Sequence, residues 1–282
     1  MTMGTGKVRA ATLVIVLVAI AAVSETRREF RYPVKAKATV SITNEYGPIS
    51  VKPANGNQVV VFAVVHSDKV EVDQSQSGNR VDVTSHLLAG ADQKSGQVDY
   101  EIQVPPDASV TLRSTTGPLQ AEKLHGDLSL QGVAAPIEVR DVNSAHVHVR
   151  TMNGPISLTN IHDGHVEITS VSGNVTMNSV SGPLVQVSST SGKISYDGDF
   201  GSGGEYSFTS HSGDILATAP SYASIDVTAR SVNGPVENDF QLQPKHTPFV
   251  IKAGSAFAGT MGKAASSVKL FSTSGKIHLK QR

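Results

Sequence analysis

A short phrase recurs from Ser114 to the end of the chain: polar residues, a glycine, then alternating apolar residues. It reads Thr151-Met-Asn-Gly-Pro-Ile in one repeat and Ser170-Val-Ser-Gly-Asn-Val in the next. The early repeats are 18 or 19 residues apart and the later ones 21, and a weaker phrase lies halfway along each. A repeat of about 20 residues built from two turn–strand units is typical of a β-solenoid, whose coils share one core.

The repeats place a small residue at two series of corners. We predict that the glycines are structural turn residues with positive φ, where a side chain would be unfavourable. The stronger series is Gly117, Ala135, Gly154, Gly173, Gly192, Gly213, Gly234 and Gly275, and the weaker series is Gly126, Ala145, Gly164 and Gly182.

Apolar residues lie two and four positions past each corner, as in Val166 and Ile168. Side chains alternate faces along a strand, so these point inward and Glu167 between them points outward. After Gly182 the pattern slips, which puts Gln186 on an inward phase and suggests a β-bulge.

The whole pattern predicts an all-β fold, a β-solenoid of the single-stranded parallel β-helix type with an irregular β N-terminal part. We divide the chain into residues 1–24, a linker at 25–33, the irregular β region at 34–112 and regular solenoid repeats at 113–282. Runs rich in Val, Ile and Tyr mark the strands of the irregular region. These are Ala38–Thr43, Ile49–Lys52, Gln58–Val65, Lys69–Val72, Arg80–Thr84 and Gln97–Val104.

Residues 1–24 have the form of a signal peptide or an N-terminal anchor. Lys7 and Arg9 precede an uncharged, mostly apolar run from Ala10 to Val23, which ends in small residues suited to a signal peptidase. An uncleaved anchor stays the alternative, because Arg27, Arg28 and Arg31 follow directly, which is unusual for a cleaved signal. We therefore expect an exported protein in the periplasm, at the cell surface or membrane-anchored facing outward.

Composition limits the function further. The 24 basic and 24 acidic residues argue against nucleic-acid binding, and we expect contact with a membrane only through the N-terminal segment, if it is uncleaved. The chain has no cysteine, which removes disulfides, thiolate metal sites and cysteine nucleophiles.

Several phrases, in their order and spacing, resemble the bacterial putative-adhesin family catalogued as domain of unknown function 4097. They are Asn44-Glu-Tyr-Gly-Pro-Ile-Ser-Val, Tyr100-Glu-Ile-Gln-Val-Pro, Leu124-His-Gly-Asp-Leu, the glycine corners and Leu270-Phe-Ser-Thr-Ser-Gly-Lys-Ile-His-Leu. The resemblance covers most of the chain after residue 24. It implies an exported or membrane-anchored right-handed β-solenoid of the bacterial cell envelope, and it brings no catalytic residues.

Histidines form the most distinctive local cluster. His146 and His165 fall in one column of successive coils, and His148 and Glu167 fall in the next outward column. Imidazoles and a carboxylate at that range suit zinc or another divalent metal. An exposed polar ladder is the favoured interpretation, so we predict no metal and no cofactor.

The other candidate sites are also weighed against ordinary turn chemistry. Asp197-Gly-Asp199 and Asn143 lie in turns that suit calcium, but the nonapeptide repeat of calcium-binding β-rolls is absent. Corner Ser and Thr hydroxyls suit a glycan or their own backbone, and we favour the backbone. Outward acids are scattered, so we predict no catalytic residues; they are Asp127, Glu138, Glu167, Asp214 and Glu237.

We therefore expect a non-enzymatic exported envelope module, an adhesin or surface-interaction protein, whose partner is an envelope protein or a glycan surface. One alternative is a structural or envelope-stress-sensing scaffold. A polysaccharide-acting β-helix enzyme is a weaker alternative, because such enzymes cluster carboxylates on one sheet face.

The inward and outward assignment is testable with two neighbouring residues. Val166→Asp is expected to unfold the stack, because an unpaired charge in an apolar core costs several kcal/mol. Glu167→Ala is expected to change stability by no more than about 0.5 kcal/mol. Thermal melts of the two variants measure the difference, and equal melting temperatures would show that the phase is wrong.

Overall fold

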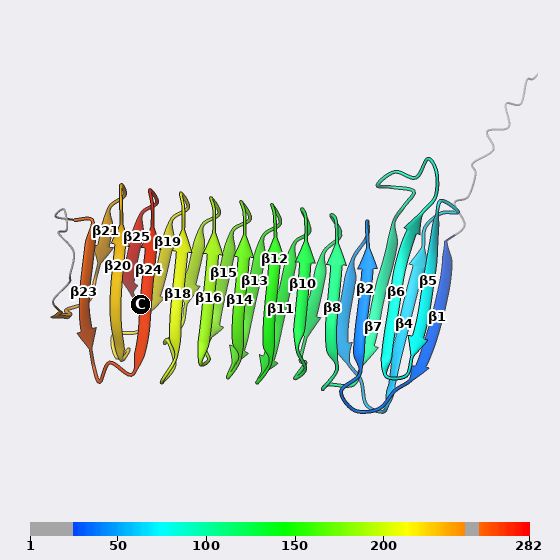
Figure 1. Cartoon of the computed structure of the whole chain (residues 1–282), viewed down its shortest axis with the longest axis horizontal. Helices are drawn as coiled ribbons and strands as arrows, with labels where there is room; N and C mark the ends of the chain where they lie inside the picture. The colour runs from blue at the N-terminus through cyan, green and yellow to red at the C-terminus, as the bar shows by residue number, and fades with distance from the viewer. Residues whose placement is uncertain (1–24, 246–253) are drawn as a thin grey trace, which may run out of the picture.

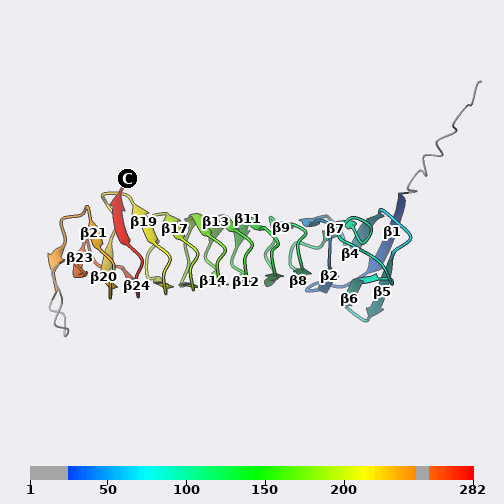
Figure 2. The same ribbon diagram turned by 90° about the horizontal axis from the view of Figure 1, so that it is seen from above.

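The computed structural model describes residues 25–245 and 254–282, and all regular structure in these ranges is β-strand. The strands form two long sheets that face each other in a flattened solenoid (Figures 1 and 2). The all-β solenoid expected from the repeats is confirmed. The segment assigned to a signal peptide or anchor, residues 1–24, lies outside the described residues.

We call the 12-stranded sheet the first sheet and the 13-stranded sheet the second. In spatial order the first sheet contains β1 (Thr26–Pro33), β4 (Gln58–Val65), β7 (Val98–Val104), β3 (Ile49–Pro53), β9 (Leu119–Glu122), β11 (Ile137–Asn143), β13 (Ile156–His162), β15 (Val175–Val180), β17 (Ile194–Asp197), β19 (Ile215–Ala219), β25 (Ile277–Gln281) and β21 (Val236–Asn238). The second contains β22 (Gln243–Pro244), β23 (Ala256–Met261), β20 (Ile225–Ser231), β24 (Ser266–Ser272), β18 (Glu205–Ser210), β16 (Leu184–Ser189), β14 (His165–Ser170), β12 (His146–Thr151), β10 (Leu128–Gly132), β8 (Ser109–Ser114), β2 (Thr39–Asn44), β6 (Arg80–Leu87) and β5 (Val70–Ser77).

From β8 to β19 the chain alternates between the sheets, and each strand pairs in parallel with the strand of the next coil. Val147 is therefore the register partner of Val166, and both are buried. Glu167 is exposed, as the alternation predicts. The inward residues of all coils belong to one continuous apolar cluster, which no single coil could form alone.

The N-terminal part belongs to the same solenoid. β2 pairs in parallel with β6 and β8, and β3 pairs in parallel with β7 and β9. The coil β2–β3 thus lies between β6–β7 and β8–β9, although β6 and β7 come later in the chain than β2 and β3. What makes this region irregular is its chain order and its antiparallel strands β1, β4 and β5.

The expected linker at residues 25–33 is wrong, because Thr26–Pro33 forms the edge strand β1. Tyr32 is buried and Phe30 packs against the core. The three arginines between and beside these aromatic residues made the segment look like a charged connector. On an edge strand, charged side chains next to buried ones are common, because they discourage pairing with another chain.

The C-terminal end has a matching interruption of chain order. β24 lies between β18 and β20, and β25 lies between β19 and β21, as the red strands between yellow ones show in Figure 1. The last coil of the sequence is therefore not the last coil of the solenoid. β20–β23 closes this end, with β23 running antiparallel to β20.

The corner glycines are required for a different reason from the one predicted. None of the glycines in the two repeat series has a positive φ. Instead, a Cβ on Gly173 would lie 1.9 Å from the carbonyl oxygen of Gly154, and one on Gly117 would lie 1.7 Å from that of Gly47. Backbone of one coil touches backbone of the previous coil at each corner, so no side chain fits between them.

Positive φ occurs instead on non-glycine residues near the opposite ends of the first-sheet strands. Asp141 and Asn160, with φ of 54° and 55°, are examples, and their side chains form a hydrogen bond of 2.9 Å. Short polar side chains tolerate this left-handed conformation better than other side chains. The same conformation is found at Lys123, Ser144, Asp163 and Ser179.

The predicted bulge at Gln186 is wrong. Gln186 points outward and pairs in register with Glu167, while Val185 and Val187 are buried. The strand keeps its spacing, and it is Gly182 that stands one place earlier in its corner than Gly164. Counting inward and outward positions from Gly182 therefore gives an assignment that is wrong by one residue.

The glycine-rich segment Gly198–Gly204 connects β17 to β18, and it carries an unexpected core residue. Phe200 has a φ of 62° and is fully buried, with its ring stacked on Tyr196 at a centroid distance of 4.6 Å. Tyr206 and Phe208 complete this aromatic cluster. The longer repeat therefore widens the core locally, and Phe200 fills the added space.

The backbone contact at the corners gives a direct test. Gly173→Ala is expected to lower the free energy of unfolding by about 2–3 kcal/mol, because the methyl group overlaps the carbonyl of Gly154. Ser172→Ala, one residue away and exposed, removes only a side-chain hydrogen bond and should cost about 1 kcal/mol or less. Urea unfolding measures both, and equal losses would contradict the contact explanation.

Candidate functional site

Most buried hydroxyls at the corners form hydrogen bonds with the backbone, and Ser114 Oγ and Ser210 Oγ are the exceptions among the described residues. Ser170 Oγ donates to the carbonyl oxygen of Gly173 at 2.6 Å, and Ser189 Oγ donates to that of Gly192 at 2.9 Å. Ser172 Oγ, on the exposed side, reaches the carbonyl oxygen of Met152 at 3.3 Å. These hydroxyls act in turn chemistry, the interpretation favoured from the sequence, and are not presented as a free ladder.

The four histidine-cluster residues lie on the outer face of the second sheet in the predicted columns. His146 and His165 are stacked, with ring centroids 4.8 Å apart. His148 Nδ1 lies 3.3 Å from Glu167 Oε2, and His146 Nδ1 lies 3.7 Å from Asp127 Oδ1. They form separate pairs, and no three His, Cys, Asp or Glu side chains converge on a metal position in residues 25–245 and 254–282.

The scattered acids each have a local partner. Glu138 pairs with Arg140 at 2.8 Å, and Glu237 pairs with Lys276 at 2.7 Å. Asp214 Oδ1 accepts a hydrogen bond from the backbone of Lys276 at 2.8 Å. Among the turn residues weighed for calcium, Asp199 accepts from the backbone of Gly201, and Asp197 pairs with Arg282. The structure brings none of these together as a facing carboxylate pair.

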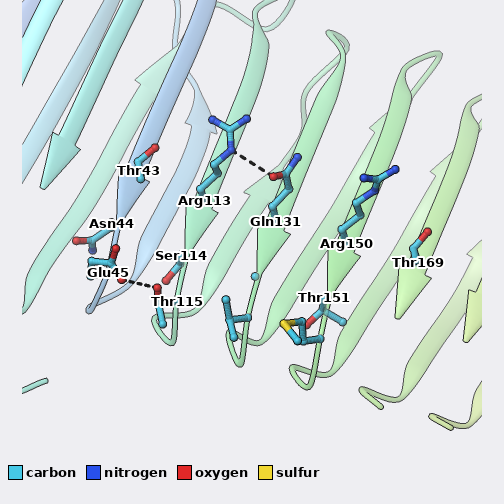
Figure 3. A pocket seen from close by; sticks show the side chains of 13 residues that line it. Thr43, Asn44, Glu45, Arg113, Ser114, Thr115, Gln131, Arg150, Thr151 and Thr169 are labelled. Atoms are coloured by element: carbon cyan, nitrogen blue, oxygen red, sulfur yellow. Dashed lines mark hydrogen bonds between the residues drawn. The ribbon is translucent and has the colours of Figure 1, made fainter. Parts of the chain in front are cut away.

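A groove of about 510 Å³ runs along the corner edge of the second sheet, across β2, β8, β10, β12 and β14 (Figure 3). One wall is the register column of Arg113, Gln131 and Arg150. The other wall comes from residues two positions further along each strand, where Thr115, Val133 and Met152 project from the corners. The sequence analysis did not identify this groove.

The first wall carries positive charge without a matching carboxylate. Arg113 Nε donates to Gln131 Oε1 at 3.2 Å, and both arginines are exposed. Within the part of the chain that the structure describes, neither Arg113 nor Arg150 forms an ion pair. The acid in the groove lining, Glu45, accepts a hydrogen bond from Thr115 Oγ1.

The second wall is apolar and exposed at Val133 and Met152, and this apolar column continues beyond the groove to Val171. Val133, Met152 and Val171 occupy the same corner position in three successive coils, with 43%, 51% and 43% of their surface exposed. Other coils have Glu45, Thr115, Thr190, His211 or Thr273 at this position, and Val232 is apolar there at the C-terminal end. The run of three adjacent apolar residues is therefore local. The signal was present in the sequence as apolar residues inside otherwise polar corner phrases.

The polar end of the groove contains two atoms without a hydrogen-bond partner. Asn44 Oδ1 and Ser114 Oγ are both buried and unpaired in the described structure. Unpaired buried acceptors are uncommon in folded proteins. This end of the groove therefore has buried polar atoms whose hydrogen-bonding capacity is unused.

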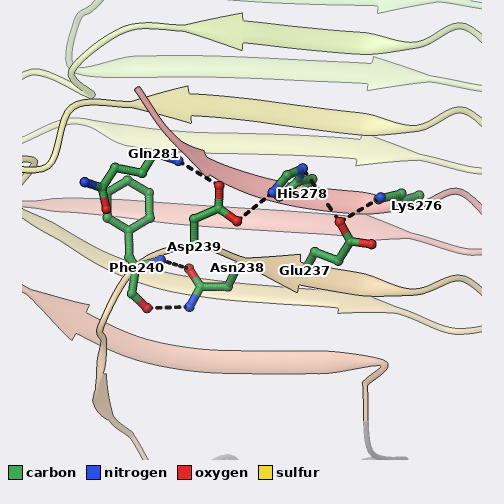
Figure 4. Close-up of polar contacts among 7 residues, drawn as sticks. All are labelled: Glu237, Asn238, Asp239, Phe240, Lys276, His278 and Gln281. Atoms are coloured by element: carbon green, nitrogen blue, oxygen red, sulfur yellow. Dashed lines mark hydrogen bonds and ion pairs between the residues drawn. The ribbon is translucent and has the colours of Figure 1, made fainter.

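A second polar cluster lies at the C-terminal end, where β21 meets β25 (Figure 4). His278 Nε2 lies 2.9 Å from Asp239 Oδ1, and its Nδ1 lies 3.8 Å from Glu237 Oε2. The hydrogen bond from His278 lowers the pKa of Asp239 below its usual range. These contacts join neighbouring strands, so we assign them a structural role.

Comparison with known proteins identifies the family. A family model described as Toastrack DUF4097 matches residues 38–280. No curated protein matches the chain. Among solved structures, a putative cell adhesion protein from Clostridium sporogenes is similar at 14% identity, covering 91% of this chain and 100% of its own, with a TM-score of 0.30. At that score the likeness carries no argument about function.

A search of the described strands and connections finds no helix with the length and hydrophobicity needed to cross a membrane.

The pairing of Asp239 with His278 predicts a pH-dependent contribution to stability. Because the pKa of Asp239 is lower in the folded state than in the unfolded state, its ionised carboxylate stabilises the fold. This stabilisation is fully present at pH values above the ordinary Asp pKa of about 3.9, and it is lost as the pH falls through the lower pKa of the folded state. Wild type should therefore unfold at higher urea than Asp239→Asn at pH 7, by a small margin because the carboxylate is exposed. The margin should close below about pH 4, and an equal margin at pH 3 would contradict the assignment.

Proposed function

Because this chain belongs to the Toastrack DUF4097 family, we propose that it is a non-enzymatic interaction module of the cell envelope. The observation that carries the proposal is the groove on the second sheet, where arginines without an ion pair lie beside an exposed apolar stripe. Contiguous exposed apolar surface on a soluble fold commonly marks a contact site. An adhesin or surface-interaction role uses such a surface directly.

The solenoid architecture supports this role. Parallel coils present their outward residues in straight columns, so a partner meets a long, regular surface rather than an enclosed pocket. The outward acids are engaged with neighbours on their own sheet, which disfavours a polysaccharide-acting enzyme. We expect the partner to be an envelope protein or a glycan surface.

Export is the second part of the proposal. The apolar run from Ala10 to Val23 follows Lys7 and Arg9, as in a secretory signal. The described structure begins its first strand at Thr26, so cleavage after Ser24 would leave β1 intact. A retained anchor would instead hold the N-terminal end of the solenoid at the membrane.

A structural or stress-sensing scaffold is the alternative role. The interleaved coils at both ends favour it, because they tie the terminal coils into the stack on both sides. A scaffold of this kind requires no ligand in the groove.

Cell fractionation with N-terminal sequencing tests the proposed location. A product outside the cytoplasm, starting at Glu25 or retaining its N-terminus at the membrane, is the expected result. A cytoplasmic product with an intact N-terminus would contradict the envelope role.

Cross-linking of the full chain in intact envelopes then tests interaction. Reproducible cross-links to an envelope protein or glycan are expected, and their absence together with an envelope defect on deletion would favour the scaffold.

A further inference from the structure

We propose that the groove binds an extended peptide segment in which acidic and aliphatic residues alternate. This inference rests on the proposed interaction role and names the class of partner. It is carried by three features of the groove: the two arginines without an ion pair, the apolar stripe beside them, and the length of the depression.

The charges point to an anionic partner. Arg113 and Arg150 are separated by one coil, and with strands about 4.8 Å apart their backbones lie about 10 Å from each other. Gln131 between them supplies a neutral polar side chain and already orients Arg113 through a hydrogen bond of 3.2 Å. Guanidinium groups bind carboxylates in a bidentate manner, so acidic side chains are suitable partners for this wall.

The apolar column distinguishes a peptide from a glycan. Val133 and Met152 in the groove, and Val171 next to them in the same column, offer aliphatic and thioether surface. No aromatic side chain lines the groove on which a sugar ring could stack. Methionine adapts its shape to varied aliphatic partners and is common at peptide-binding surfaces. This wall therefore suits Leu, Val or Ile side chains.

The geometry of an extended chain fits both walls at once. Alternate side chains of an extended peptide point to opposite sides, so acids would face the arginine column while aliphatic residues face the stripe. From Thr43 on β2 to Thr169 on β14 there are four strand spacings, or about 19 Å, which corresponds to roughly six extended residues.

The test uses the full exported chain and a fluorescein-labelled octapeptide of alternating Glu and Leu. Fluorescence anisotropy is expected to show binding that is at least about tenfold tighter than for the same peptide with Lys in place of Glu or Ser in place of Leu. Binding should weaken as salt rises from about 0.05 to 0.5 M, because exposed charges are screened. Equal binding of all three peptides, or none, would overturn the proposal.

Variants locate the site. The double variant Arg113→Gln and Arg150→Gln should weaken binding about tenfold, and Met152→Ser should weaken it about threefold. All three residues are exposed, so melting temperatures should stay near that of wild type. Arg140→Gln, a matched exposed arginine on the first sheet, should leave binding unchanged. Unchanged binding in the double variant would show that the groove is not the site.

A separate arm tests the glycan alternative with polygalacturonate. Binding of this polymer that is lost in the double variant, without binding of the Glu–Leu peptide, would overturn the peptide assignment while leaving the interaction role in place. Failure of the envelope cross-linking experiment, in contrast, would remove the interaction role itself.

Discussion

The close approach of backbone to backbone at the corners is the constraint on which the structure depends. The carbonyl oxygen of Gly154 occupies the space that a Cβ on Gly173 would need, and the same relation recurs along the stack. Parallel pairing sets the coils about 4.8 Å apart, so consecutive corners must be equally close. That one spacing explains three features of each repeat. They are the glycine at the corner, the buried hydroxyl three residues before it, and the apolar residues two and four positions after it.

The regular coils could be predicted because this constraint acts on neighbours at a fixed sequence distance. The alternation around Val166 and Glu167 is visible in the sequence for that reason. The interleaved ends were not visible, because β2 pairs with β6 and β8 through contacts that no repeat encodes. The bulge expected at Gln186 was wrong because Gly182 is displaced by one residue in its corner while the strand register is unchanged.

The groove arises from small departures within the same repeat. Val133, Met152 and Val171 are three successive apolar residues at a corner position that is otherwise polar except at Val232. Arg113 and Arg150 belong to a column that continues along the stack with Thr169, Ser188 and Thr209. None of these positions is distinctive by itself in the sequence. Stacking the coils brings them into two neighbouring columns, and the column of Arg113, Gln131 and Arg150 is labelled in Figure 3.

The interleaving at the C-terminal end also separates the order of strands in the chain from their order in the stack. β24 and β25 follow β20–β23 in the chain, yet they fill a gap between coils that come earlier. During synthesis this interior layer is therefore made after the layer outside it, and the stack beyond β19 stays divided until β24 and β25 have been made. A frameshift near residue 265 would not shorten the solenoid from its tip; it would remove a middle layer and separate β20–β23 from the rest of the stack.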